Sequence, residues 1–222
     1  MIQLESVYKT YWQNKDEKFD ALSDINLTID EGIVILKGIS GSGKSTLLSL
    51  IAGFDKPTSG KVIVDGMPIS KLPDLHLSAY RANKIGFVFQ HFNLIESLSV
   101  EENILAPLAN QDIEISQAKT KVQKVMQEVG IGHKAKQNIK NLSGGEKQRC
   151  AIARALVGEP SIILCDEPTA NLDRENSLKF IEILKTLNSS NRTIIIATHD
   201  PIFDDMRLEY QTIHIHSGKI GS

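Results

Sequence analysis

The segment that most constrains the fold of this chain is a glycine-rich run, Gly38-Ile39-Ser40-Gly41-Ser42-Gly43-Lys44-Ser45-Thr46. The apolar residues 33–36 before it have the pattern of a β-strand, and residues 44–52 after it have the pattern of a helix. A glycine-rich loop in this setting lets consecutive backbone N–H groups point at phosphate oxygens, and the helix start adds its positive end. We expect Lys44 to reach the β- and γ-phosphates of a nucleotide and the Ser45 hydroxyl to bind Mg²⁺.

Two adjacent acids follow an apolar run later in the chain. Residues 162–165 are Ile-Ile-Leu-Cys, and Asp166 and Glu167 come directly after them. An unpaired acid at the end of a buried strand is costly. Phosphoryl-transfer proteins place a Mg²⁺-holding acid there, so we expect Asp166 to hold the ion directly or through water. Glu167 is expected to orient or deprotonate the attacking water. The alternative is that both acids begin a solvated loop.

A second glycine-rich helix start lies at Leu142-Ser143-Gly144-Gly145-Glu146. Ser143 and Glu146 have the spacing of a capping box, which is a purely structural explanation. Two glycines in a first helical turn cost around 1 kcal/mol each relative to alanine, which makes sense where bare N–H groups must touch an anion. Both explanations can hold together. Because one phosphate loop suffices to hold ATP, the second glycine-rich start predicts that the nucleotide is gripped from two sides.

Strand and helix patterns alternate along the chain, which indicates a layered α/β fold with right-handed crossovers. We expect strands at residues 2–7, 25–29, 33–37, 61–64, 85–89, 161–165, 193–197 and 212–216, and helices at 44–52, 116–129, 144–157 and 174–187. Residues 162–164 and 194–196 are continuously apolar, as in parallel strands covered on both faces. Residues 91–157 lack a convincing strand, so we expect one domain over 1–222, with a core from 1–90 and 158–222 and an inserted helical subdomain.

Composition and length narrow the function classes. The formal charge is −2, so no global basic excess indicates nucleic-acid binding, and we expect no nucleic-acid partner. Cys150 and Cys165 lack metal-ligand spacing and are expected to be buried, reduced thiols. No apolar run approaches the length of a membrane span, and we expect neither a secretory signal nor a further C-terminal domain. Any membrane role is therefore expected to come through a partner.

Together these motifs resemble the nucleotide-binding subunit of an ATP-binding-cassette (ABC) transporter over essentially the whole chain. Residues 38–46 match the Walker A loop, residues 162–167 match Walker B, and residues 142–146 match the family signature, usually LSGGQ. Glu146 departs from that consensus, but glutamate is a common variant. The resemblance implies the P-loop NTPase fold of ABC ATPases, which has a mainly parallel core sheet, an antiparallel β part and an inserted helical subdomain.

The resemblance also implies roles for single residues. Gln90 matches the Q-loop glutamine, which touches Mg²⁺ or the attacking water, and His199 matches the switch histidine that contacts the γ-phosphate. Asp173 matches the D-loop aspartate at the dimer interface, with a helix N-cap as the alternative. Tyr11 is the expected stacking platform for adenine, with Tyr8, Trp12 and Phe19 nearby. The expected catalytic set is Glu167, His199, Gln90 and Lys44. The expected metal ligands are Ser45, Gln90 and Asp166. The expected nucleotide contacts are Tyr11, Gly38, Ser40, Gly41, Ser42, Gly43, Lys44, Ser45, Thr46, Gln90, Ser143, Gly144, Gly145, Asp166 and His199.

As a member of this family, the chain would bind ATP and Mg²⁺ between two copies related by a twofold axis, and would open when the γ-phosphate is removed. Its partner would be an integral membrane permease-type subunit, placing it at the cytoplasmic face of the inner membrane. Residues 85–94 and 167–173 are similar to the lipoprotein-releasing, macrolide-export and cell-division branch, which favours export or mechanical work over import. Ala170 stands where that branch usually has glycine. The alternatives are a cell-division-type regulator of cell-wall enzymes and a soluble ABC ATPase acting on nucleic acid or ribosomes.

Overall fold

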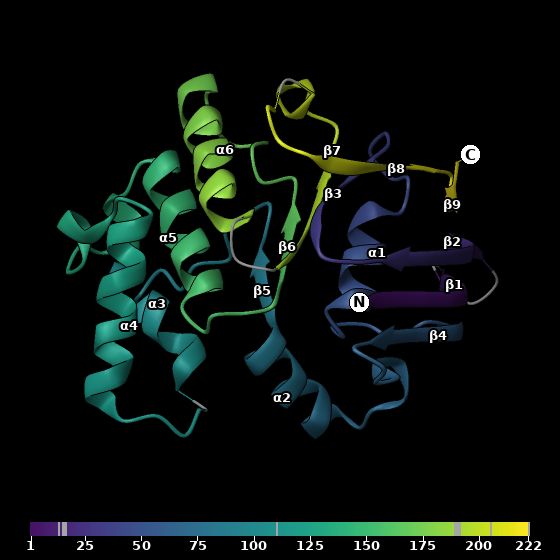
Figure 1. Cartoon of the computed structure of the whole chain (residues 1–222), viewed down its shortest axis with the longest axis horizontal. Coiled ribbons are helices and arrows are strands. Elements are labelled where there is room, and N and C mark those ends of the chain that lie inside the picture. The colour runs from purple at the N-terminus through teal and green to yellow at the C-terminus, as the bar shows by residue number, and fades with distance from the viewer. Residues whose placement is uncertain (13, 15–16, 110, 189–191, 205, 222) are drawn as a thin grey trace.

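The computed structural model describes residues 1–12, 14, 17–109, 111–188, 192–204 and 206–221. Two sheets form its framework (Figure 1). The larger has six strands in the order β5-β6-β7-β3-β8-β9, and the smaller has three in the order β2-β1-β4. Their bounds are β1 Ile2–Trp12, β2 Lys18–Ile29, β3 Gly32–Lys37, β4 Ser59–Val64, β5 Ile85–Val88, β6 Ile162–Asp166, β7 Thr193–Thr198, β8 Tyr210–His216 and β9 Lys219–Ile220.

In the larger sheet, neighbouring strands from β5 to β8 are parallel, and β9 pairs antiparallel with β8. In the smaller sheet, β1 pairs antiparallel with both β2 and β4. The predicted α/β class with a mainly parallel core and an antiparallel part is therefore confirmed. The central strands β6 and β7 are buried along almost their whole length, as their continuously apolar sequences predicted.

The helices form layers around the larger sheet. Their bounds are α1 Lys44–Ile51, α2 Asp74–Lys84, α3 Val100–Leu105, α4 Ile115–Glu128, α5 Gly144–Leu156 and α6 Arg174–Asn188, with short 3-10 turns at Ile69–Lys71, Ala106–Leu108, Gly132–Lys134, Ile139–Asn141 and Pro201–Phe203. In Figure 1, α3, α4 and α5 lie together on one side, while α1 lies between the larger sheet and β1. None of the helices in the described part combines the length and the apolar character needed to cross a bilayer.

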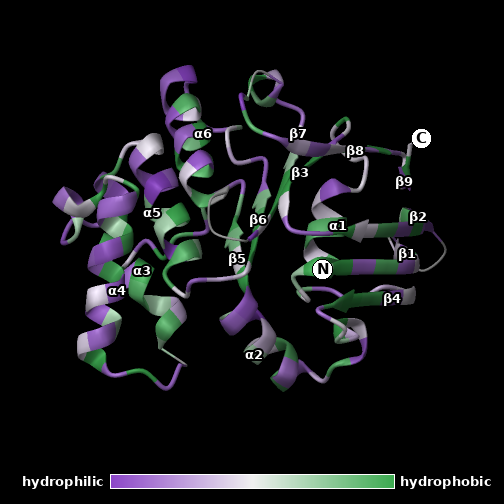
Figure 2. Cartoon of the chain, in the orientation of Figure 1, coloured by the Kyte–Doolittle hydropathy of each residue, from purple (hydrophilic) through white to green (hydrophobic). Residues whose placement is uncertain are grey.

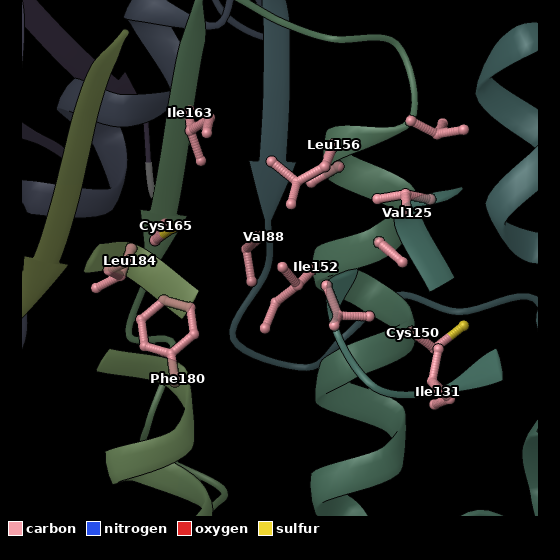
Figure 3. Close-up of a cluster of buried hydrophobic side chains, with 14 of the residues drawn as sticks. Val88, Val125, Ile131, Cys150, Ile152, Leu156, Ile163, Cys165, Phe180 and Leu184 are labelled. Atoms are coloured by element: carbon pink, nitrogen blue, oxygen red, sulfur yellow. The ribbon is translucent and has the colours of Figure 1, made fainter. Parts of the chain in front are cut away.

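Two hydrophobic clusters hold these layers together. One joins α1 to both sheets, through Leu47 and Leu48 against residues such as Ile2 and Leu36. The other joins the opposite face of the larger sheet to α3, α4, α5 and α6; Figure 3 shows Val88 and Ile163 facing Ile152 of α5 and Phe180 of α6. Figure 2 shows apolar residues concentrated on the strands and on the helix faces that meet them. Cys150 and Cys165 are buried free thiols within the second cluster.

Several boundaries differ from the sequence-based expectation. β1 and β2 pair as long strands that extend beyond the predicted residues 2–7 and 25–29. The sequence pattern missed these extensions because they are largely exposed or half-exposed and carry no continuous apolar run. β5 ends at Val88 rather than at residue 89, so Gln90 does not end a strand but lies in the turn that follows. The helices α2 and α3 were not predicted. Between residues 91 and 157 the described residues form helices, turns and one isolated bridge between Ser99 and Asn138. The division into a core and a helical subdomain is compatible with this and stays a proposal.

Candidate functional site

Four segments that carry predicted site residues meet at one edge of the larger sheet. The strands β5, β6, β7 and β3 are adjacent and parallel, and their carboxyl ends lie nearly level, since Asp166 is paired with Ala197 and Lys37 with Thr198. The segments that leave these ends carry, in order, Gln90, the two acids, His199 and the glycine-rich loop. Parallel strands bind ligands at this edge. The fold therefore brings together residues that are up to about 160 positions apart in the sequence.

The glycine-rich loop turns tightly into α1. Gly43 caps the helix with φ of 108°, a left-handed conformation that favours glycine. A Cβ at Gly43 would lie 2.6 Å from the backbone oxygen of Ala21, so the loop also needs glycine for close packing. As a result, the N–H groups at the start of α1 face outward at the sheet edge.

The loop presents a buried cation and a buried hydroxyl. The Lys44 ammonium donates hydrogen bonds to the backbone oxygens of Gly38 at 2.7 Å and Ile39 at 3.1 Å, and it lies 3.6 Å from Glu167 Oε1. The Ser42 hydroxyl is buried and finds no hydrogen-bond partner among the described residues. A cation at the start of a helix fits an oxyanion such as phosphate.

Oxygen donors suitable for Mg²⁺ lie next to this loop. The Ser45 hydroxyl donates to Asp166 Oδ1 at 2.8 Å. Burial raises the pKa of Asp166, and the neighbouring charge of Glu167 adds to this, while the hydrogen bond from Ser45 lowers it. In the described part of the chain no group of three or more His, Cys, Asp or Glu residues could hold a metal by itself. One carboxylate and one hydroxyl fit Mg²⁺, which commonly takes its remaining ligands from substrate phosphates and water.

Glu167 is held in an unusual backbone conformation at the centre of the site. Its φ is 44°, in the left-handed region, and its N–H donates to the backbone oxygen of Ala197 at 2.8 Å. Its carboxylate Oε1 lies 2.9 Å from His199 Nδ1 and faces the Lys44 ammonium. Only 8% of Glu167 is exposed, so its carboxylate is directed into the site rather than into solvent. The alternative of a solvated loop does not describe this residue.

Gln90 reaches the same place from a turn instead of a strand. Its backbone oxygen accepts a hydrogen bond from Asn171 Nδ2 at 2.7 Å. Sequence reasoning gave no separate role to this Asn171 side chain, because only the folded chain brings it beside a residue 81 positions earlier.

These residues surround a cavity of about 240 Å³. Its lining combines the glycine-rich loop, one residue after each of the strands β5, β6 and β7, and two residues of β2: Phe19, Ala21, Ser40, Gly41, Ser42, Gly43, Lys44, Ser45, Thr46, Gln90, Glu167 and His199. A larger cavity of about 370 Å³ lies elsewhere, between α4 and α6, and holds none of the predicted site residues. Hydrogen-bond donors, the Lys44 cation and the Glu167 carboxylate make the smaller cavity the better candidate for a phosphate-bearing substrate.

The second glycine-rich start does not contribute to this cavity. Ser143 caps α5 through a complete capping box with Glu146, as the spacing predicted. A Cβ at Gly145 would lie 2.3 Å from Asn176 Oδ1, so packing within the chain already requires this glycine. A Cβ at Gly144 would only approach the backbone oxygen of Asn171 at 3.5 Å, an ordinary contact. The chain itself therefore gives a reason for Gly145 but none for Gly144.

Two further predicted residues occupy defined positions. Asp173 Oδ1 accepts a hydrogen bond from the backbone N–H of Asn176 at 2.8 Å, so the helix-cap alternative describes it. Its predicted contact with a second copy stays a prediction. Tyr11 lies behind Phe19, with the ring centroids 5.7 Å apart, and it is Phe19 that lines the cavity. The predicted stacking of adenine on Tyr11 stays a prediction as well.

The family model described as ABC transporter matches residues 22–170. Three curated relatives align with about 90% of the chain: the methionine import ATP-binding protein MetN of Vibrio cholerae at 44% identity, the uncharacterized ABC transporter ATP-binding protein YknY of Bacillus subtilis at 42%, and the macrolide export ATP-binding/permease protein MacB of Hyphomonas neptunium at 39%. The chain spans 58% of the length of MetN, 87% of YknY and 31% of MacB.

Among solved structures, the dimeric ATP-binding cassette MJ0796 in a post-hydrolysis state with ADP and Pi superimposes with a TM-score of 0.90 at 37% identity. The match covers 100% of this chain and 97% of that one.

Proposed function

Because this chain belongs to the ABC transporter family and carries its ATP-hydrolysing cassette, we propose that two copies bind ATP between them and use its hydrolysis to drive a membrane partner. The observation that carries this proposal is the convergence of Lys44, Glu167, Gln90 and His199 around one cavity at the carboxyl edge of the sheet. Each group has the chemistry that phosphoryl transfer to water requires there.

Binding of the triphosphate is assigned to the glycine-rich loop. The N–H groups of the loop and the positive end of α1 attract phosphate oxygens. The Lys44 ammonium is already held near the loop by the Gly38 and Ile39 carbonyl groups, so little side-chain freedom is lost when phosphate binds.

A divalent ion would be held by Ser45 and Asp166, with Gln90 as the third predicted ligand. When bound, Mg²⁺ offsets charge on the β- and γ-phosphate oxygens. Asp166 lies at the end of a buried strand with a raised pKa, and a cation beside it would favour its ionised form.

Attack by water is assigned to Glu167. Its carboxylate is fixed by the left-handed backbone and by His199, so it would orient a water molecule and accept its proton. His199 is 63% exposed at its side chain, which leaves it able to reach the γ-phosphate side of the site. Gln90 lines the cavity near both groups and would orient the water from the other side.

A second copy is part of the proposal because the signature motif at residues 142–146 does not line the cavity of its own chain. The described residues that line the cavity do not include Ser143, Gly144 or Gly145. Packing among the described residues does not explain why residue 144 is a glycine. A glycine leaves its N–H exposed, which supports a contact between Gly144 and the nucleotide phosphate bound to another copy. The solved relative is itself a dimer with ADP and Pi, which supports the same arrangement.

The membrane partner would be an integral permease-type subunit at the cytoplasmic face of the inner membrane, and its work would be export or transmission of force. The macrolide export protein among the relatives supports export. Import is a second candidate, favoured by the methionine import proteins at up to 44% identity. Purification from membranes with the bound integral subunit identified would decide between them, since the two candidates require different partners.

The catalytic assignment is tested by Glu167→Gln. We expect the turnover number for ATP to fall about 100-fold or more, because the base is lost, while ATP affinity is retained. Steady-state hydrolysis and calorimetric binding measure the two quantities separately. Glu159→Gln is the matched control: Glu159 also has a left-handed φ, of 54°, but pairs with Lys121 outside the site, so its turnover should be unchanged. Equal turnover in Glu167→Gln and the wild type would refute the role.

A further inference from the structure

A compact polar network links β1 to the segment after α1, outside the groups assigned to hydrolysis. The Tyr11 hydroxyl donates to Asp55 Oδ2 at 2.7 Å, and the Lys9 ammonium donates to Asp55 Oδ1 at 2.6 Å. Lys9 also donates to the backbone oxygen of Lys56 at 2.8 Å, and the Lys56 N–H donates to Asp55 Oδ1 at 2.7 Å. The Lys9 side chain is only 12% exposed, so this ion pair is screened less than those on the surface.

The path of the chain explains how Asp55 reaches Tyr11. The helix α1 begins at the phosphate-binding loop, and the chain reverses direction after it ends. The N–H groups of Phe54 and Asp55 both donate to the backbone oxygen of Ser49, at 3.0 and 3.4 Å, so this segment folds back along the helix. Asp55 is thereby fixed to the same element that carries Lys44 and Ser45.

The network holds the Tyr11 ring beside the cavity. The Lys9 ammonium lies over the Tyr11 ring, 4.7 Å from its centroid, in a cation–π contact. Phe19, which lines the cavity, lies 5.7 Å from the same ring with the planes 31° apart. Burial, together with Asp55, raises the pKa of Tyr11 to about 12. Phe19 and Tyr11 therefore connect the cavity to Asp55.

A fixed aromatic ring binds a flat base better than a mobile one. An untethered tyrosine has two side-chain torsions to immobilise when a base stacks on it, and that ordering opposes binding. The hydroxyl–carboxylate hydrogen bond fixes those torsions before the ligand arrives, and it is of the charge-assisted kind that is stronger than a neutral one.

We propose that Asp55, supported by Lys9, is a positioning residue that holds Tyr11 by its hydroxyl and so fixes an aromatic wall of Tyr11 and Phe19 for the base of the nucleotide. This inference rests on the proposed function, because it assumes that the phosphates of that nucleotide occupy the loop at Lys44. It adds that base binding depends on the hydroxyl as well as on the ring.

The test compares a probe with a base and a probe without one. Calorimetry gives the dissociation constants of MgADP, which is not hydrolysed, and of inorganic triphosphate for the wild type, Tyr11→Phe and Asp55→Asn. Tyr11→Phe keeps the stacking surface and removes only the tether. We expect each variant to bind MgADP about 3- to 10-fold more weakly, the effect of immobilising one side chain, and to bind inorganic triphosphate as the wild type does.

Two controls make the result specific. The double variant Tyr11→Phe/Asp55→Asn should bind MgADP no more weakly than either single variant, because both changes break one interaction. Glu5→Gln removes an ion pair of the same strand, between Glu5 and Lys61 at 3.1 Å, that does not contact Tyr11, so both dissociation constants should be unchanged. Thermal unfolding of each variant establishes that it is folded.

The outcomes separate this inference from the proposed function. If Tyr11→Phe and Asp55→Asn bind MgADP as the wild type does while Tyr11→Ala binds it weakly, the ring alone suffices and the inference is overturned. Parallel weakening of MgADP and inorganic triphosphate would also overturn it, since the network would then support the phosphate loop. If the wild type binds neither probe, the proposed function fails, and the inference fails with it.

Discussion

At the scale of single residues, Glu167 combines backbone strain with charge contacts. A non-glycine residue in the left-handed region costs about 1–3 kcal/mol and persists only where the surroundings enforce it. Here the surroundings are the hydrogen bond from its N–H to Ala197 and the contacts of its carboxylate with His199 and Lys44. The strain keeps the carboxylate at the sheet edge, where a water molecule can reach it.

Lys44→Ala tests the phosphate assignment. Removing the ammonium should weaken ATP binding about 10- to 100-fold, because a charge-assisted hydrogen bond is lost in a buried position. Lys37→Ala serves as the control: Lys37 ends the preceding strand and pairs with Asp204 instead of facing the site. Calorimetry should show wild-type affinity for the control and reduced affinity for Lys44→Ala. Equal affinities for the two variants would contradict the assignment.

Substitution by alanine should change the free energy of unfolding differently at Gly144 and at Gly145. Gly145→Ala should lower the free energy of unfolding by about 1–3 kcal/mol, because its Cβ would collide with Asn176. Gly144→Ala should leave it unchanged or raise it by up to about 1 kcal/mol, because alanine favours the helix and meets no close neighbour. Urea denaturation of both variants measures the difference. Equal destabilisation would show that Gly144 also serves packing.

Most residues of the candidate site could be proposed from the sequence because each follows or precedes a strongly patterned element. The sequence could not supply the pairings between them. The contacts of Glu167 with His199, Asn171 with Gln90, and Asp55 with Tyr11 join residues 32, 81 and 44 positions apart. Such contacts depend on strand order and on a reversal of the chain, and neither follows from local pattern.

At the scale of elements, α5 starts with a charged cap. The Glu146 carboxylate accepts a hydrogen bond from the Ser143 N–H at 2.8 Å and pairs with Lys134 at 3.1 Å. The hydrogen bond from Ser143 is the main cause that lowers the pKa of Glu146 to about 2, with Lys134 adding to it against a smaller opposing effect of burial. The cap thus stabilises the helix start only while Glu146 is ionised.

The pH dependence of this cap follows from the lowered pKa. The stabilisation is present above the unfolded-state pKa of about 4.5 and is lost as pH falls through about 2. Glu146→Gln should therefore be less stable than the wild type near pH 6, by about 1 kcal/mol, because the charge-assisted hydrogen bond and the partly exposed ion pair are both lost. The difference should close as pH falls toward 2. Urea denaturation of both proteins between pH 2 and pH 6 measures it, and a difference that grows at low pH would contradict the account.

Elements with continuous apolar or periodic sequences were the ones predicted correctly. The helix α2 was missed because only Leu77 and Tyr80 of its residues are buried, which leaves a weak apolar stripe. The short α3 was missed although Ser99 and Glu102 form a capping box at its start. A cap without a long periodic run after it is a weak signal, since the packing of α3 against α5 decides its conformation.

At the scale of the whole molecule, the helix that begins at the second glycine-rich motif shares a core with the sheet that carries the proposed catalytic groups. The cluster that contains Val88 and Ile163 continues without a break to Ile152 on α5 and Ile131 beyond α4 (Figure 3). Movement of the signature helix relative to the sheet must therefore repack part of one hydrophobic cluster. If the proposed partner binds at the helical layer, a change in nucleotide contacts would be transmitted to it in this way.

The central claim is that Mg-ATP joins two copies through Gly144 of one and the phosphate loop of the other. Sedimentation velocity of Glu167→Gln, with and without saturating Mg-ATP, tests it most directly. The matched variant is Glu167→Gln/Gly144→Asp, which places a negative charge at a position with room for a side chain. We predict that Glu167→Gln becomes a dimer only with Mg-ATP, and that the double variant binds ATP but stays monomeric. A Glu167→Gln protein that binds ATP and remains monomeric, or a double variant that dimerises equally well, would contradict the claim.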